Sequence, residues 1–245
     1  MDPALQLEMG YRRTSYGYMF CRRRPGRGGA LVMLHGLGAS SNTWRKLIRF
    51  LPNDSDIYMP DLIGHGHSDA PDIEYEMAVQ LKSVSEFIGS LRIENPVVLG
   101  HSYGAWIAGL YAARNSSGGI IFEDSAGLEP FAEHLRDTAK EGAYRSWLLE
   151  ESLKICPERP HVMSSIINNM DRDTLTGGTL SKIKCKTLIV WGGSDSVVPS
   201  SLGNWLAEEI GGSRLVIIDG ADHVPHISKP DAVGSVVSEF LASIR

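Results

Sequence analysis

Short apolar runs alternate along the chain with stretches of helical periodicity, and this alternation constrains the fold more than any other feature. Alternating strand and helix patterns are typical of βαβ units, which build a mostly parallel central sheet with helices on both faces. The runs are rich in β-branched and aliphatic residues, as strands buried on both faces require. They lie at Ala30–Leu34, Ser55–Met59, Pro96–Leu99, Gly119–Phe122, Thr187–Trp191 and Leu215–Ile218. The sequence therefore predicts an α/β fold.

Helical patterns follow most of these strands. They lie at Thr43–Leu51, Glu76–Leu91, Tyr103–Arg114, Ser200–Ile210 and Pro230–Ile244. Ahead of the first parallel strand, Tyr11–Arg24 predicts an antiparallel hairpin. Its basic end, Arg22 to Arg24, is expected to be an exposed, solvated edge rather than a binding surface.

One interval breaks the alternation, because residues Gly127 to about Lys182 contain helical stretches but no strand pattern. The clearest helical stretches are Phe131–Lys140 and Tyr144–Ile155. We interpret residues 1–126 and 183–245 as one α/β core domain. Residues 127–182 are then a small helical cap inserted over one edge of the sheet.

Composition narrows the classes of partner. The 245 residues are compatible with a single domain. Lys and Arg number 24 against 29 Asp and Glu, so the net charge of −5 offers no basic surface for nucleic acid or an anionic membrane. The cysteines Cys21, Cys156 and Cys185 lie too far apart for a disulfide scaffold or a CxxC motif. With no apolar run of membrane-spanning length and no leader pattern, we expect a cytoplasmic protein with a small-molecule partner and an undetermined oligomeric state.

A candidate nucleophile lies where a buried strand runs directly into a helix. Gly100, Ser102 and Gly104 match the pattern G-x-S-x-G at that point. In such a strand–turn–helix the serine adopts a strained backbone angle on a sharp turn, and the flanking glycines avoid collisions. A helix-capping role for Ser102 would also satisfy the pattern taken alone.

A nucleophilic serine needs a base within hydrogen-bond reach and a carboxylate that orients the base. Asp195 follows the predicted strand Thr187–Trp191, and His223 follows the next strand along the chain. Because the carboxyl ends of parallel strands meet at one edge of a sheet, these loops and that of Ser102 can converge. We therefore predict a catalytic site of Ser102, His223 and Asp195.

Five segments in order resemble the α/β-hydrolase superfamily, in particular its serine carboxylesterases, over almost the whole chain. They are HGLG at 35–38, DLIGHGHS at 61–68, GHSYG at 100–104, WGGSD at 191–195 and GADHVP at 220–225. The resemblance implies that Ser102 attacks the ester, His223 transfers the proton and Asp195 fixes the imidazole tautomer. It also implies an oxyanion hole formed by the backbone N–H groups of Leu37 and Tyr103.

Three residues compete for the roles of acid and base. Asp124 is the rival acid, because some members of the resembling family carry the carboxylate one strand earlier, although the Asp195 segment matches better. Asp222 adjoins His223, but neighbours in an extended loop point apart, which makes Asp222 a poor orienter. His226, three residues beyond His223, is the competing base.

The other histidines are expected to be structural. His65 and His67 lack carboxylate or cysteine partners in sequence, so we expect no metal site there. His35 is expected to form structural hydrogen bonds, and His101 to pack beneath the turn of the nucleophile. Four apolar residues could line an acyl pocket, although core packing is their default role, and those of the cap are the better candidates: Trp106, Trp147, Phe131 and Met163.

The leading hypothesis is a cofactor-free serine hydrolase of carboxylic esters with small or medium acyl chains, acting through an acyl-enzyme. Because Ser102 occupies the nucleophile position, haloalkane dehalogenase and epoxide hydrolase activities, which use aspartate, are disfavoured. A carbon–carbon bond hydrolase stays open, although Val224 and Pro225 follow the histidine where many such enzymes carry an aromatic residue. A perhydrolase or haloperoxidase would use the same triad, and a non-catalytic ligand receptor is the alternative of a different class.

Overall fold

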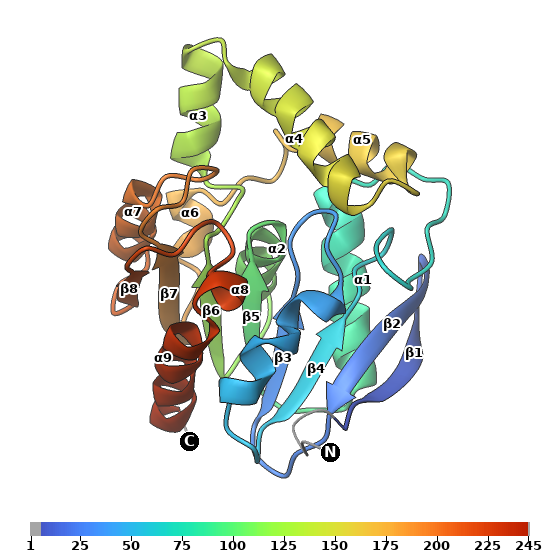
Figure 1. Cartoon of the computed structure of the whole chain (residues 1–245), viewed down its shortest axis with the longest axis vertical. Helices are drawn as coiled ribbons and strands as arrows, with labels where there is room; N and C mark the ends of the chain where they lie inside the picture. Colours follow the sequence, from blue (N-terminus) through green and yellow to red (C-terminus); the bar gives the residue numbers. More distant parts are fainter. Residues whose placement is uncertain (1–5, 245) are drawn as a thin grey trace.

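The computed structural model describes residues 6–244, which form one eight-stranded sheet in the order β1-β2-β4-β3-β5-β6-β7-β8 (Figure 1). β1 and β2 are antiparallel, β2 is antiparallel to β4, and the remaining neighbours are parallel. The strands are β1 (Glu8–Thr14), β2 (Gly17–Arg24), β3 (Ala30–Leu34), β4 (Asp56–Pro60), β5 (Val97–His101), β6 (Gly119–Glu123), β7 (Lys186–Gly192) and β8 (Arg214–Ile218). The predicted α/β class, with a mostly parallel sheet, is confirmed.

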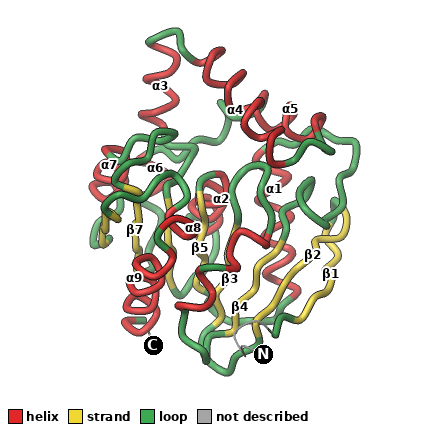
Figure 2. The backbone as a smooth tube through the Cα atoms, in the orientation of Figure 1, coloured by secondary structure: helices red, strands yellow, loops and turns green. Residues whose placement is uncertain are grey.

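Helices cover both faces of this sheet and also the edge where the parallel strands end (Figure 2). One buried cluster unites α1, α2 and α7 with the sheet, and a second unites η2, η3 and α9 with the opposite face. Helices α3, α4 and α5 lie above the carboxyl ends of the strands (Figure 1). The helices are η2 (Ser41–Arg45), η3 (Leu47–Phe50), α1 (Met77–Ser90), α2 (Tyr103–Ala112), α3 (Glu129–Asp137), α4 (Glu141–Ile155), α5 (Pro160–Asn168), α6 (Gly177–Leu180), α7 (Ser201–Glu209), α8 (Pro225–Ser228) and α9 (Pro230–Ser243).

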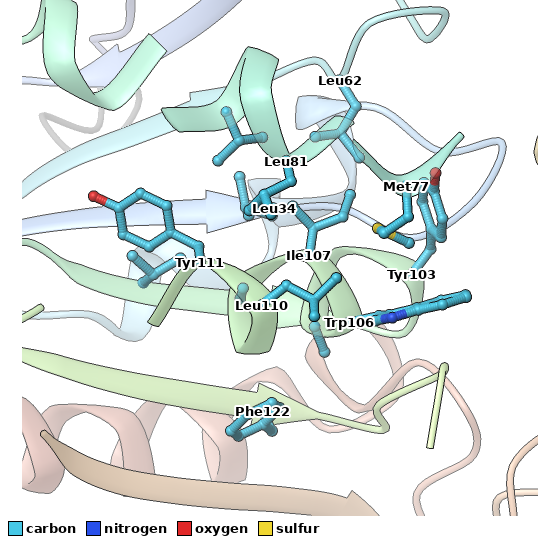
Figure 3. Packing of buried hydrophobic residues seen from close by; sticks show 14 of the residues in the cluster. Leu34, Leu62, Met77, Leu81, Tyr103, Trp106, Ile107, Leu110, Tyr111 and Phe122 are labelled. Carbon is cyan, nitrogen blue, oxygen red and sulfur yellow. The ribbon is translucent and has the colours of Figure 1, made fainter. Parts of the chain in front are cut away.

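Helix α2 is the most deeply buried helix near the site, since all of its residues are buried. Figure 3 shows the side chains of its Tyr103, Trp106, Ile107 and Leu110 close to those of neighbouring elements, including Phe122 of β6. A helix that is apolar on every side is stable only in a protein interior. Each such side chain contributes about 1.5–3 kcal/mol when fully buried, which fixes the helix that begins directly after Ser102.

Two local expectations from the sequence are wrong. The stretch Thr43–Leu51 forms the two 3₁₀ turns η2 and η3 rather than one α-helix. Pro52 has no N–H to donate to the carbonyl of Ile48, and the Arg24 guanidinium donates to that carbonyl and to those of Leu51 and Pro52 instead. Arg24 is accordingly only 4% exposed, whereas the sequence predicted a solvated basic edge.

The hairpin and the parallel strands lie within three residues of their predicted positions. The last strand differs in burial, because β8 is an edge strand and Ile217 is 44% exposed. All three cysteines are free thiols, as their spacing predicts. None of the helices within residues 6–244 combines the length and the apolar character that crossing a bilayer would require.

The segment between β6 and β7, all of which is described, contains helices α3 to α6 and one isolated bridge between Leu128 and Leu175. Hydrogen bonds join this segment to the remainder of the protein. Arg159 donates to the carbonyls of Gly66 and Ser68, and the indole of Trp106 donates to the carbonyl of Asp173. The division into a core and a cap spanning 127–182 stays an interpretation of the sequence.

Candidate active site

Ser102 lies on the sharp turn between β5 and α2, with φ 50° and ψ −114°. A positive φ is uncommon for a residue other than glycine and is concentrated at functional sites. A Cβ at Gly100 would collide with the backbone of Gly104 and Ala105, and one at Gly104 would collide with the carbonyls of Leu34 and His35. The turn therefore requires both glycines. The side chain of Ser102 makes no helix-capping hydrogen bond, so the capping alternative is wrong.

The structure brings Ser102, His223 and Asp195 together from three loops. Nε2 of His223 lies 3.1 Å from Oγ of Ser102, and Nδ1 lies 2.8 Å from Oδ2 of Asp195. The other carboxylate oxygen of Asp195 accepts the N–H groups of Val197 and Val198 at 2.7 and 3.0 Å. An ionised carboxylate only accepts, so Nδ1 carries the proton and Nε2 is left to accept the serine hydroxyl.

The charge state of Asp195 follows from its surroundings. Burial by itself would raise the pKa of this carboxyl, whose side chain has no exposed surface. The hydrogen bond and charge of His223, followed by the N–H of Val198, outweigh burial and hold the pKa below its ordinary value. Asp195 is therefore ionised near neutral pH, as an orienting carboxylate must be.

Two further histidines support the loops of this site through hydrogen bonds, which were predicted for His35 but not for His101. Nε2 of His101 lies 2.7 Å from the carbonyl of His223. Nε2 of the fully buried His35 accepts the N–H of Leu62 at 3.0 Å, so its Nδ1–H donates to the carbonyl of Gly36 at 2.8 Å. Burial lowers the pKa of both imidazoles, which keeps them neutral.

The backbone N–H groups of Leu37 and Tyr103 have the surroundings expected of oxyanion-hole donors. Within residues 6–244 neither N–H is paired with a backbone carbonyl. Both residues border the same pocket as Ser102 and His223. Unpaired N–H groups beside a nucleophile can bind negative charge that develops on a substrate oxygen.

That pocket has a volume of about 820 Å³, within the range typical of small-molecule sites. Helix α4 supplies an apolar wall containing Trp147, Leu148 and Ile155, whereas η2 and its approach supply polar side chains. Of the predicted acyl-pocket residues only Trp147 lines it. Trp106 and Phe131 line a smaller adjoining cavity. Met163 is buried in the core, in the hydrophobic cluster that joins α1, α2 and α7 to the sheet.

His226, the rival base, belongs to a second hydrogen-bonded relay. Its Nδ1 lies 2.8 Å from Oε2 of Glu123, its backbone N–H donates to Oε1 at 2.9 Å, and its Nε2 lies 2.7 Å from Oγ1 of Thr43. Neither Glu123 nor Thr43 is among the residues predicted from the sequence. The available signal was a glutamate in an otherwise apolar strand, since a buried carboxylate needs a partner.

The rival acids are also engaged elsewhere. Asp222 accepts the N–H of Val224 and the hydroxyl of Ser228, so it does not orient His223. Asp124 accepts the N–H of Gly192 at 2.8 Å, although its carboxyl lies close to the side chains of Asp195 and His223. One ligand atom each of Asp124, Asp195 and His223 lie within 4.8 Å of one another.

This trio has the spacing of metal ligands. Most of these atoms are already engaged in hydrogen bonds, however, because both oxygens of Asp195 accept N–H groups and Nδ1 of His223 donates its N–H. His65 and His67 belong to no such group within the described part of the chain. The imidazole of His65 is fully buried, and burial followed by the nearby His35 lowers its pKa to about 3.

The fold and the arrangement of these loops define an α/β hydrolase, and the chain belongs to the alpha/beta hydrolase family, whose model matches residues 31–236. Among relatives, the monoacylglycerol lipase ABHD6 of Mus musculus is 26% identical over 272 residues, covering 93% of this chain and 81% of the relative. The monoacylglycerol lipase abhd6-A of Xenopus laevis is also 26% identical, covering 98% and 84%.

Solved structures share the fold. A putative lipase from Acinetobacter baumannii superposes with a TM-score of 0.84 at 19% identity, covering 99% of this chain and 93% of that one. An esterase from Exiguobacterium antarcticum gives a TM-score of 0.80 at 20% identity, covering 96% of this chain and all of that one. The likeness to these two structures is one of fold, and the sequence relatives named above are monoacylglycerol lipases.

Proposed function

We propose that the protein hydrolyses carboxylic esters of small or medium acyl chains through an acyl-enzyme on Ser102. The observation that carries the proposal is the position of the His223 imidazole, 3.1 Å from the Ser102 hydroxyl and 2.8 Å from the Asp195 carboxylate. The α/β-hydrolase fold alone would not assign an activity, because function resides in the site rather than in the fold.

In the first half of the reaction the ester carbonyl lies beside Ser102, and Oγ attacks it while the hydroxyl proton passes to Nε2 of His223. Asp195 stabilises the imidazolium that results. The carbonyl oxygen becomes an oxyanion, which the N–H groups of Leu37 and Tyr103 bind. Collapse of this intermediate transfers the proton from His223 to the departing alkoxide and leaves the acyl group on Ser102.

In the second half a water molecule attacks the acyl-enzyme while Nε2 of His223 accepts its proton. The tetrahedral intermediate forms in the same oxyanion hole and collapses to the free acid, and the proton returns to Oγ of Ser102. No step requires a cofactor. The apolar wall from α4 contributes substrate selection, because Trp147 and its neighbours contact an acyl chain that extends away from Ser102.

The test is a panel of p-nitrophenyl esters from acetate to longer acyl chains, with monoacylglycerols included because the relatives are monoacylglycerol lipases. We expect turnover of the short and medium esters. Ser102→Ala should lower kcat by several orders of magnitude. Ser146→Ala, an exposed serine whose hydroxyl donates to the carbonyl of Gly142, is the matched control and should retain activity.

Other outcomes favour the alternatives. Turnover no faster than the uncatalysed background, with tight ligand binding that survives Ser102→Ala, would favour a receptor. Serine-dependent activity confined to peracid formation or to carbon–carbon cleavage would reassign the reaction while keeping the site. A cytoplasmic location, a small-molecule partner and the absence of nucleic-acid or membrane partners stay predictions from the sequence.

A further inference from the structure

A second carboxyl group, that of Asp124, lies close to the proposed catalytic relay and has no role in the mechanism above. Asp124 directly follows β6, next to the loop of Ser102, with φ 45° and no exposed surface. Its Oδ1 accepts the N–H of Gly192, but its buried Oδ2 receives no N–H or O–H from any residue in the range 6–244. Leaving an ionised oxygen buried without a donor is costly.

Another carboxyl group, that of Asp195, lies close to the carboxyl of Asp124. Asp124, Asp195 and His223 each place one polar atom within 4.8 Å of the other two. Two ionised carboxylates at such a distance in a buried site repel each other, so one of them carries a proton. His223 and two backbone N–H groups stabilise the charge of Asp195, whereas Asp124 has only the N–H of Gly192. The proton therefore belongs to Asp124.

We propose that Asp124 is a neutral carboxylic acid that donates a hydrogen bond to Asp195 and thereby positions the carboxylate that orients His223. A protonated carboxyl is a donor through one oxygen and an acceptor through the other. This division matches the two environments of Asp124, since Oδ1 accepts from Gly192 and Oδ2 is left to donate. Asp124 is a positioning residue, because within residues 6–244 its side chain makes no hydrogen bond to Ser102 or His223 and acts through Asp195.

The titration behaviour agrees with this geometry. Burial, with the neighbouring carboxyl of Glu123 as the next cause, raises the pKa of Asp124 to about 11. The hydrogen bond from Asp124 also contributes to lowering the pKa of Asp195. The other titratable groups facing Asp195 are His223 and the phenol of Tyr144, which lies in the cap segment.

Two variants separate this role from ordinary packing. Asp124→Asn keeps the acceptor for Gly192 and offers Asp195 an N–H donor, but it does not ionise. Asp124→Leu has a similar size and offers neither. The expected changes in kcat/KM rest on the proposed function. We expect Asp124→Asn to lose no more than about threefold in kcat/KM and Asp124→Leu to lose at least about tenfold, as removal of a hydrogen bond to a charged group would do.

The pH profile adds a measurement that a purely structural role would not change. In Asp124→Leu the carboxylate of Asp195 loses a donor and attracts the positively charged form of the neighbouring imidazole more strongly, so the acidic limb of kcat/KM should move to higher pH. In Asp124→Asn the limb should stay in place. A limb that moves to lower pH in Asp124→Asn would overturn the proposal, because it would mean that a negative charge near His223 had been removed.

A measurement that needs no substrate keeps the inference separate from the proposed function. The infrared difference spectrum between the wild type and Asp124→Asn at neutral pH should contain the carbonyl band of a protonated carboxylic acid. Its presence supports the neutral acid even if no ester is hydrolysed. A band pattern of an ionised carboxylate instead would overturn the proposal, whatever the activity of the protein.

Discussion

The burial of Asp124 affects the free energy of unfolding of the protein, and the size of this effect can be calculated. In Asp124→Asn the side chain keeps its shape and its hydrogen-bonding atoms but has no proton to lose. The variant therefore isolates the free energy associated with keeping one carboxyl group neutral in the folded protein. We expect Asp124→Asn to raise the free energy of unfolding at neutral pH.

The magnitude follows from the linkage between proton binding and folding. Asp124 has an ordinary pKa of 3.8 when unfolded, and burial raises the pKa in the folded protein to about 11. Between these values the unfolded chain binds one proton fewer than the folded protein, so the free energy of unfolding falls by about 1.4 kcal/mol per pH unit. At pH 7 this amounts to roughly 4 kcal/mol relative to a side chain that does not ionise.

Urea unfolding followed by tryptophan fluorescence measures this difference for the wild type and Asp124→Asn. The variant should be the more stable protein near pH 7. Its advantage should widen from roughly pH 6 to pH 8 by about 1.4 kcal/mol per pH unit. An advantage that stays constant or shrinks as the pH rises would refute the reasoning, because Asp124 would then be ionised in the folded protein.

Three further predictions concern the neighbouring groups. Asp195→Asn should lower kcat by about 10⁴, because His223 would lose the acceptor that selects its tautomer, and steady-state kinetics with an active ester measures this loss. Glu123→Ala should lower the free energy of unfolding by about 3–5 kcal/mol in urea titrations, since it leaves His226 without its buried partner; an unchanged midpoint would contradict the pairing. Trp147→Ala should raise KM for longer acyl chains more than for acetate and change the free energy of unfolding by no more than about 0.5 kcal/mol, because this side chain is 38% exposed on the pocket wall.

The sequence predicts those parts of the site that depend on backbone constraints. The turn at Ser102 tolerates only glycine at positions 100 and 104, which leaves a recognisable pattern, and the parallel sheet orders the loops that carry Asp195 and His223. Both are local or topological properties, and a strand followed by a helix is visible in hydrophobic periodicity.

The features that sequence analysis missed depend on contacts between distant segments. Glu123 and His226 are separated by 103 positions, and the pairing depends on how α8 packs against the end of β6. Arg24 is buried because carbonyls at the end of η3 lack partners, which periodicity does not reveal. The neutral state of Asp124 likewise results from burial and from the carboxyl groups of Glu123 and Asp195, and because Asp195 is distant in sequence, no local pattern identifies it.

The central claim is that Ser102 is the nucleophile of an ester hydrolase. Its most direct measurement is reaction of the wild-type protein with an organophosphonate, followed by peptide mass spectrometry and by assay of the remaining esterase activity. The account predicts one phosphonyl group on Ser102 and a loss of activity in proportion to its formation. Modification of another residue, or full turnover by protein that is completely modified at Ser102, would contradict it.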